Sequence, residues 1–475
     1  MAQIGKSIVG VGIQYGDEGK IKIFDRFFKE MGAVVRYNGA TNAGGTLKVG
    51  NKEIVLHGMP GAVHHKKVIQ YLGSGALLNP IKMTGEIENA NKIGANLENR
   101  LKFSSKVSLI QPHHILLDKI MGGKIGTTGN GIGPGYSDQA LRQLGNQLKN
   151  VRFGDFLSNP EEYRTHVENN LQEVVDNHKM KNINVMDEVN KFVEETKKLE
   201  RYLCQDPLFL EKIIQSGKNI FFQGVNSTML DLITGDVPFV TSSRTLASAA
   251  YTGGDLSLKY HAKTIAVGKA IMSRVGNGPF ISEFGGEKSE LYCGEEGGYK
   301  HIFGVEESMY DSAKLLTSSD PFEMGIGLRM LGGEYGATTK RPRRIGRLDF
   351  VLLKQQCILN GVDELYLNKF DCLNQFAETN LPGIPVVTAY KLDGNTIDYY
   401  PSTIKEARRA EPVIDYLPHI REDISNVRDY KDLPSSVIEG IKIIESHTGV
   451  HLFGIGVGPK RKDFVSTDPN KYSRN

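Results

Sequence analysis

The sequence predicts an α/β fold with a large, mostly parallel central sheet and helices on both faces. Short apolar segments alternate along the chain with segments of helical periodicity, as in a parallel sheet with crossover helices. The 53 glycines in 475 residues exceed the usual ~7% and cluster at the ends of expected strands, where glycine-rich loops commonly bind phosphate. No linker rich in proline or serine divides the chain, so we expect a single domain over residues 1–475.

The elements are assigned in chain order. An apolar strand at 7–13 is followed by a glycine-rich loop and by a helix with apolar residues at three-to-four spacing from Ile21 to Phe28. Residues 155–215 are predicted to be a helical insertion, and residues 285–332 form a second insertion with too little periodicity to assign. Alternation around Asp393-Gly394 predicts a small antiparallel hairpin. Further buried strands are expected at 33–37, 54–57, 68–72, 219–223, 364–369 and 451–457.

Composition argues against membrane and nucleic-acid partners. The 58 basic residues nearly balance 55 acidic ones, and no segment has the ~20 consecutive apolar residues of a membrane span. The amino terminus lacks the layout of a secretory signal. The four cysteines form no CxxC pair or disulfide-dense pattern, so we expect a reducing, cytoplasmic location.

The loop Gly12–Lys20 lies between the first strand and helix, where backbone N–H groups and the helix dipole favour a phosphate. It resembles a P-loop but departs from GxxxxGK[ST], because Ile21 stands where the magnesium-binding hydroxyl would be. Asp17 could replace that hydroxyl as a metal ligand. The alternative is an ordinary glycine turn with a solvated Asp17–Glu18 pair.

Eight motifs, taken in order, resemble the adenylosuccinate synthetase family over nearly the whole chain. They are QYGDEGK (14–20), VVRYNG (34–39) with NAG (42–44), IGTTG (125–129) with GIGP (131–134), VTSS (240–243), SRVG (273–276), GATT (336–339) with Arg341, Arg343 and Arg344, NKFD (368–371), and GP (458–459).

The resemblance implies a GTP-dependent ligase that joins L-aspartate to IMP. In that family a carboxylate removes the N1 proton of IMP, the 6-oxygen accepts the γ-phosphoryl group of GTP, and the aspartate amine then displaces phosphate. Asp17 matches the base, which also binds Mg²⁺ together with the carbonyl of Gly44. Lys20, with Gly16 and Gly19, matches the phosphate loop. The family's role is therefore purine nucleotide biosynthesis, and GTP and Mg²⁺ are the implied co-substrate and cofactor.

The resemblance also places the two acceptor substrates. Residues that match IMP contacts are Asn42, Thr128, Asn226, Thr241 and Arg142. In the family this arginine reaches the IMP phosphate across a homodimer interface, although its spacing alone suits a solvated helix residue.

The cationic run Lys340–Arg347 suits a dicarboxylate, because arginine binds carboxylates through paired N–H groups. The family's aspartate loop maps onto Thr339, Arg341 and Arg343, although Lys340 and Pro342 depart from it. The alternative is a polyanion-binding or nuclear-localisation patch.

A guanine pocket is expected at NKFD. The carboxylate of Asp371, beside Lys369, can accept hydrogen bonds from guanine N1–H and the 2-amino group, a donor pair that adenine lacks. By resemblance, Gly458 and Pro459 close the pocket. Without the family context, a strand ending in a capping aspartate fits these residues equally well.

Three departures from the family lie around the expected reaction centre. The family's Asn-Ala-Gly-His is here Asn-Ala-Gly-Gly, so Gly45 replaces the histidine that acts as general acid. Asn226 is shorter than the family's glutamine, and Ile21 replaces a glycine. Three hypotheses remain open: a divergent adenylosuccinate synthetase, a paralogue that uses another 6-oxopurine nucleotide such as dGMP, and a nucleotide-binding protein without activity.

Overall fold

The computed structural model describes residues 4–41, 45–49, 52–121, 129–294, 298, 300–336 and 340–467. The chain divides into two compact units. Unit 1 contains residues 1–10, 24–226 and 241–262, and unit 2 contains residues 11–23, 227–240 and 263–475. None of the helices in the described part of the chain is long and apolar enough to cross a membrane.

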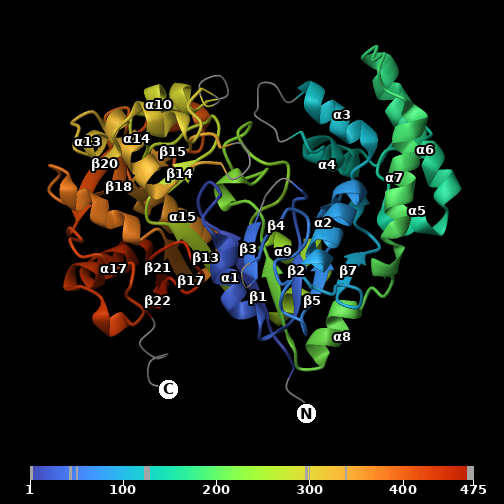
Figure 1. Ribbon diagram of the computed structural model, residues 1–475, viewed down its shortest axis with the longest axis horizontal. Helices are drawn as coiled ribbons and strands as arrows, with labels where there is room; N and C mark the ends of the chain where they lie inside the picture. Colours follow the sequence, from blue (N-terminus) through green and yellow to red (C-terminus); the bar gives the residue numbers. More distant parts are fainter. Residues whose placement is uncertain are drawn as a thin grey trace. The chain divides into compact units, whose positions relative to one another are not determined.

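A ten-stranded sheet runs in the order β11-β7-β5-β2-β12-β1-β13-β17-β21-β22 (Figure 1). All the strand pairings described in this sheet are parallel except β21–β22. The predicted α/β class with a mostly parallel sheet is therefore confirmed. Its strands are β1 (Ser7–Gly12), β2 (Met31–Arg36), β5 (Ile69–Leu72), β7 (Leu101–Ser104), β11 (Leu203–Cys204), β12 (Asn219–Gln223), β13 (His261–Lys269), β17 (Val362–Asn368), β21 (Leu452–Gly456) and β22 (Phe464–Ser466).

Unit 1 surrounds its part of the sheet with helices. Among them α6 packs against α7, both visible at its edge in Figure 1. Its helices are α2 (Pro80–Lys92), α3 (Pro112–Met121), α4 (Ile132–Leu141), α5 (Phe153–Ser158), α6 (Pro160–Asn177), α7 (Val185–Lys198), α8 (Phe209–Gln215) and α9 (Ala249–Gly253), and α1 (Lys20–Phe28) is shared with unit 2. Short strand pairs are β3 (Gly45–Val49) with β4 (Lys52–Leu56), β6 (Leu77–Leu78) with β8 (Ser108–Leu109), and β9 (Gln143–Leu144) with β10 (Gln147–Leu148).

Besides its strands of the ten-stranded sheet, unit 2 contains short sheets and helices. The predicted hairpin is confirmed: β18 and β19 are antiparallel, with positive φ at Asp393 and Gly394 in the turn. The strands are β14 (Met272–Arg274), β15 (Arg344–Gly346), β16 (Leu348–Asp349), β18 (Ile384–Leu392), β19 (Asn395–Ile397) and β20 (Glu411–Leu417). The helices are α10 (Gly286–Cys293), α12 (Val305–Met309), α13 (Ser312–Leu316), α14 (Pro321–Gly332), α15 (Phe350–Asn360), α16 (Ile404–Arg409) and α17 (Ser435–Thr448).

Three local assignments differ from the sequence expectation. The strand expected at 54–57 is β4, which pairs only with β3 and lies outside the large sheet. The described residues of the segment 285–332 include helices α10, α12, α13 and α14, whose amphipathic pattern is broken by glycines and short length, so the sequence periodicity did not assign them. Strand β13 was not expected, because its first three residues are polar or small and mask the buried run from Thr264 to Lys269.

The core of unit 2 contains a buried carboxyl group that makes stability depend on pH. Asp349 caps α15, accepting hydrogen bonds from Leu352 N at 3.0 Å and from the Tyr390 hydroxyl at 2.7 Å. Burial raises the pKa of Asp349 from 3.8 to about 6, although both hydrogen bonds oppose the shift. The folded state therefore favours the protonated carboxyl. The contribution of Asp349 to the free energy of unfolding is fully present below pH 3.8 and is lost as the pH rises through 6.

We expect Asp349→Asn to stabilise the chain at pH 7 by up to about 3 kcal/mol, because the amide keeps the cap without an ionised form. Thermal melts of variant and parent from pH 4 to 7 test this. The difference in Tm should grow with pH, and a constant difference would contradict the assignment.

Candidate active site

The loop between β1 and α1 folds around a buried glutamate. Oε1 of Glu18 accepts the backbone N–H groups of Gly16 at 2.9 Å and Gln14 at 3.2 Å, and its Oε2 lies 2.8 Å from Lys20 Nζ. Ser227 also donates to this carboxylate. Burial raises the pKa of Glu18, but Lys20 and these hydrogen bonds outweigh it, so the net pKa is lowered. The interpretation as a solvated acidic pair is thus wrong for Glu18, which fixes the loop from inside.

Asp17, by contrast, stands at the tip of this loop. It has a positive φ of 57°, between Gly16 and Gly19, which also have positive φ. Its side chain is 47% exposed, and Oδ2 pairs with Arg343 NH2 at 2.7 Å. The loop geometry therefore presents one carboxylate outward while it buries the next.

A buried ionic network supports Arg343 from behind. Glu334 Oε2 lies 2.7 Å from Arg343 NH1 and 3.1 Å from Lys269 Nζ, and Oε1 lies 3.4 Å from Lys369 Nζ. Burial raises the pKa of Glu334, but the three cations outweigh it and hold that pKa well below its usual range. The carboxylate therefore stays ionised and fixes Arg343 beside Asp17.

The sequence prediction missed Glu334 and Lys269. Glu334 lies just before the 336–339 motif, and this proximity could have indicated it. Lys269 is the last residue of β13, and the carboxyl end of a strand was the signal available for it. Burial also lowers the pKa of Lys269, although Glu334 opposes this.

The cationic run 340–347 is mostly internal. Arg344 is buried, with Nε donating to Glu283 at 2.8 Å and NH1 to the carbonyl of Gly278 at 2.7 Å. Arg347 lies over the Phe284 ring at 3.9 Å and donates to the carbonyl of Glu283. A polyanion patch needs exposed cations, so that interpretation is wrong for these two arginines.

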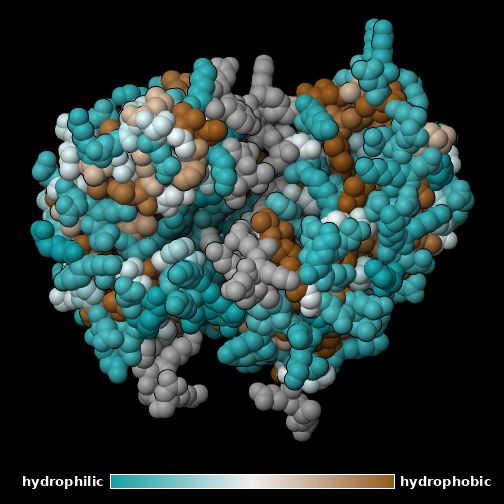
Figure 2. Space-filling model, in the orientation of Figure 1, coloured by the Kyte–Doolittle hydropathy of each residue, from teal (hydrophilic) through white to brown (hydrophobic). Residues whose placement is uncertain are grey.

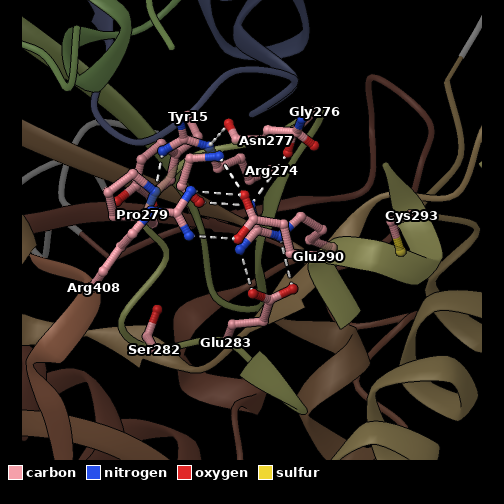
Figure 3. Close-up of polar contacts among 12 residues, drawn as sticks. Tyr15, Arg274, Gly276, Asn277, Pro279, Ser282, Glu283, Glu290, Cys293 and Arg408 are labelled. Carbon is pink, nitrogen blue, oxygen red and sulfur yellow. Dashed lines mark hydrogen bonds and ion pairs between the residues drawn. The ribbon is translucent and has the colours of Figure 1, made fainter. Parts of the chain in front are cut away.

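Figure 3 shows how this region also supports the phosphate loop. Arg274 lies over the ring of Tyr15, with its guanidinium carbon 4.6 Å from the ring centre, and donates to the carbonyls of Asn277 and Pro279. Glu290 joins Arg408 to the same turn by accepting from Gly278 N at 2.8 Å. Tyr15 precedes Gly16, so these contacts position the start of the loop.

The expected guanine residues come together in unit 2. Phe370, between Lys369 and Asp371, donates its N–H to the carbonyl of Gly456 at 3.0 Å. Lys22 Nζ donates to the carbonyl of Gly458 at 2.6 Å, which brings the 456–459 loop beside α1. Oδ1 of Asp371 is buried without a hydrogen-bond partner among the described residues, and burial raises its pKa. Such an orphaned acceptor fits a ligand with two N–H donors.

The loops that follow β2 and β12 in unit 1 carry Asn38 and Asn226. Asn38 exchanges two hydrogen bonds with Val225, at 2.9 and 3.0 Å, and so fixes the loop that ends at Asn226. Asn226 has a positive φ of 63°, and its Oδ1 is buried without a partner among the described residues. This oxygen is available to a ligand amide or N–H group.

Arg36 and Glu86 hold the adjacent loops. Arg36 is buried and donates to the carbonyls of Ala40 and His57. Glu86 accepts the N–H groups of Gly58 and Met59, each at 2.9 Å. These two groups position both ends of the segment that carries Gly45, which begins β3 opposite Leu56.

Two of the expected IMP contacts, Thr241 and Arg142, lie near α4. A Cβ on Gly133 would be 3.3 Å from Ser242 Oγ, so the start of α4 lies beside the loop that contains the half-buried Thr241. Arg142 is exposed just after the end of α4, with a positive φ of 64°. Asn42, Gly44, Thr128 and Thr339 lie outside the described residues.

Comparison with known proteins now identifies the family. Residues 9–465 match the adenylosuccinate synthetase family model. The chain belongs to this family. Adenylosuccinate synthetase 2 of Cupriavidus pinatubonensis is 36% identical over 96% of each chain, and adenylosuccinate synthetase of Caldicellulosiruptor bescii is 33% identical over 96% of this chain and 98% of its own.

Solved structures agree with the family assignment. The fully ligated adenylosuccinate synthetase from Plasmodium falciparum has a TM-score of 0.81 and 29% identity, covering 98% of this chain and all of that one. A cyanophage S-2L succinoaminodeoxyadenylate synthetase bound to dGMP and dATP has a TM-score of 0.55 and 16% identity over 98% of this chain and 96% of its own, which shows only the shared fold. The adenylosuccinate synthetase family consists of GTP-dependent ligases that form a C–N bond, which confirms the predicted enzyme class.

Proposed function

We propose that this chain joins L-aspartate to C6 of IMP at the expense of GTP, giving adenylosuccinate, GDP and phosphate. The observation that carries the proposal is the 2.7 Å pair between Asp17 and Arg343. It joins the candidate base on the phosphate loop to the candidate aspartate-binding arginine in one unit. Family membership and the preserved loops support the IMP and GTP assignments.

Asp17 is suited to the proton transfer. Its carboxylate is half-exposed at a loop tip, so it can meet the purine N1–H, and its Oδ2 is paired with Arg343 at 2.7 Å. When the aspartate substrate enters, its carboxylates compete for Arg343 and release Asp17 to act as the base. Arg341 and Thr339 are proposed to complete the aspartate contacts.

Lys20 is proposed to bind the transferring phosphoryl group. Its Nζ already lies beside Glu18 and Ser227 in the loop, where Gly16 and Gly19 allow close backbone approach. The purine oxygen accepts the phosphoryl group, and phosphate later leaves as the aspartate amine attacks C6. Lys20 stabilises the charge of that group in both steps.

The guanine of GTP is proposed to bind Asp371 and Lys369, with Gly458 and Pro459 closing the pocket. The phosphate loop offers hard oxygen donors, the type that Mg²⁺ prefers, and the outward carboxylate of Asp17 fits such a site. Asp17 and the Gly44 carbonyl would hold the ion, which would neutralise phosphate charge. IMP is assigned to Asn42, Thr128, Asn226 and Thr241.

The test is turnover by the purified chain with GTP, Mg²⁺, aspartate and, in turn, IMP, GMP and dGMP. We expect turnover with IMP only. Turnover with dGMP and not IMP would support the paralogue hypothesis, and nucleotide binding without phosphate release would leave only the non-catalytic one.

We further propose a homodimer in the cytoplasm, in which Arg142 contacts the IMP bound by the partner. Arg142 is exposed and flanked by the exposed Leu141 and Leu144, and Figure 2 shows apolar residues gathered in this part of unit 1, near α3 and α4. Free thiols at all four cysteines fit a reducing compartment.

Mixing two inactive variants tests the dimer. Arg142→Ala and Asp17→Asn subunits should each be inactive alone, whereas an equal mixture should recover about a quarter of the wild-type activity, because half of the dimers then contain one complete site. Activity that never exceeds the sum of the two separate variants would show that Arg142 does not act across an interface.

A further inference from the structure

Outside the proposed site, three metal-ligating side chains of unit 1 converge. Asp25 lies on α1, and His64 and His65 lie in the turn before β5. Oδ1 of Asp25 is 2.6 Å from Nε2 of His65 and 3.2 Å from Nε2 of His64. The two rings are tilted by 38° to each other with their centres 4.0 Å apart, and the three ligand atoms all lie within 4.8 Å of one another. The arrangement offers two imidazole nitrogens and one carboxylate oxygen.

The state of His64 is the informative feature. Both of its ring nitrogens are buried, and neither has a hydrogen-bond partner among the described residues. Its Nε2 approaches Asp25 closely but without the alignment of a hydrogen bond. Buried polar atoms are normally paired with a hydrogen-bond partner. An unpaired imidazole that points at a carboxylate therefore indicates a missing partner that accepts electron pairs, such as a metal ion.

A second cluster in the same unit pairs both of its histidine Nε2 atoms with its carboxylate, although Nδ1 of His113 has no partner among the described residues. His113 and His114 each place Nε2 about 3 Å from Oδ2 of Asp138, at 2.9 and 3.0 Å. Nδ1 of His114 accepts the backbone N–H of Gln111 at 3.0 Å, so its Nε2 must carry the proton that it donates to Asp138. Because Nδ1 of His114 is occupied and its Nε2 is protonated, His114 cannot bind a metal through Nε2, and this cluster offers one imidazole fewer than the first.

We propose that Asp25, His64 and His65 form a binding site for a divalent first-row transition ion, with Zn²⁺ as the reference ion. Two imidazoles and one carboxylate are a usual ligand set for Zn²⁺, with a water in the open position. Ligand atoms around a tetrahedral ion stand about 3.3 Å apart at bond lengths of ~2.0–2.1 Å, so small shifts suffice. The side chains of His64 and His65 are 18% and 11% exposed, which leaves a path for water and the ion.

The surrounding structure holds the two histidines in place. Arg100 donates to the carbonyls of Val63 and His65, each at 3.0 Å, and so fixes the turn. His65 also packs edge-on against Phe28 of α1. An ion bound here would join α1, whose first residue is Lys20, to this turn, and would stabilise the helix that follows the phosphate loop.

Titration of the full-length chain without a polyhistidine tag, with Co²⁺ as a coloured substitute for Zn²⁺, tests the proposal. Saturating Mg²⁺ is included to occupy the nucleotide site. We expect the wild type to show the ligand-field bands of a tetrahedral nitrogen and oxygen site, displaced by Zn²⁺. His64→Gln and His65→Gln should each weaken binding at least tenfold. The matched variant His113→Gln, also one of a buried histidine pair, should bind as the wild type does.

A second readout needs no variant, so it holds even if a histidine variant misfolds. Zn²⁺ should protect His64 and His65 of the wild type from diethylpyrocarbonate, as read by peptide mass spectrometry, and should leave the modification of exposed histidines unchanged. Absence of Co²⁺ bands in the wild type, or binding that persists in both histidine variants, would overturn the proposal. So would binding lost only in Asp17→Asn, which would place the ion in the nucleotide site.

Discussion

Asp17→Asn should lower kcat for adenylosuccinate formation by at least about 10³-fold, because the amide can neither accept the purine proton nor neutralise charge beside the phosphates. The backbone should not change, since asparagine tolerates the positive φ of 57° at this position. The KM for IMP should change less than kcat, because the other proposed IMP contacts, on Asn42, Thr128, Asn226 and Thr241, are unaltered. Steady-state kinetics with GTP, Mg²⁺, aspartate and IMP measure both quantities.

Asp393→Asn provides a matched control for this substitution. Asp393 also has a positive φ and also pairs with an arginine at 2.7 Å, namely Arg409, but it lies in the exposed β18–β19 turn. The same chemical change there should leave kcat unaltered. If Asp17→Asn kept more than a tenth of the parental kcat, Asp17 could not be the base.

The strand, loop and helix that carry the candidate phosphate site could be predicted because their signal is local. A buried strand, a glycine-rich turn and an amphipathic helix follow one another directly, and the structure has β1, the loop and α1 at those positions. What the sequence could not show is which of the two adjacent acids points outward. That choice depends on the positive φ of Asp17 and on the N–H groups of Gln14 and Gly16, which enclose Glu18.

The buried ionic network behind Arg343 could not be predicted, because its members are far apart in the sequence. Glu334, Lys269 and Lys369 come from separate elements, and each looks like an ordinary charged residue in its own segment. Only the sheet order, which places β13 next to β17, brings them together. The arginine run shows the same limit, because charge density alone does not reveal that Arg344 is buried against Glu283.

Long-range pairing also explains the misassigned elements. Residues 54–57 have the apolar pattern of a central strand, yet among the described residues β4 pairs with β3, the strand directly before it, and not with the large sheet. In the segment 285–332 the helices are stabilised by buried polar contacts as well as by apolar periodicity. Arg329 on α14, for example, pairs with the buried Glu306 on α12. A pattern search for apolar spacing does not detect such a pair.

Gly45→His is expected to raise kcat by about 10- to 100-fold, because it restores a proton donor at the position where the family has its general acid. Gly45 is the first residue of β3 and pairs with Leu56 in an antiparallel ladder, where the backbone is extended. An L-residue can therefore occupy it without backbone strain. The gain should appear in kcat rather than in KM, since the acid acts on the transferring phosphoryl group and not on ground-state binding.

Two further variants separate proton donation from the mere presence of a side chain. Gly45→Ala fills space without a donor, and Gly45→Gln donates a hydrogen bond but cannot transfer its proton at neutral pH. The expected order of kcat is His above Gln, with Gln at or above Ala. Equal rates for all three would mean that phosphoryl transfer in this chain is not limited by the missing acid, and that another group already stabilises the transferring phosphate. Lys20 is then the group to examine, because its Nζ lies in the same loop as the proposed base and is held there by Glu18.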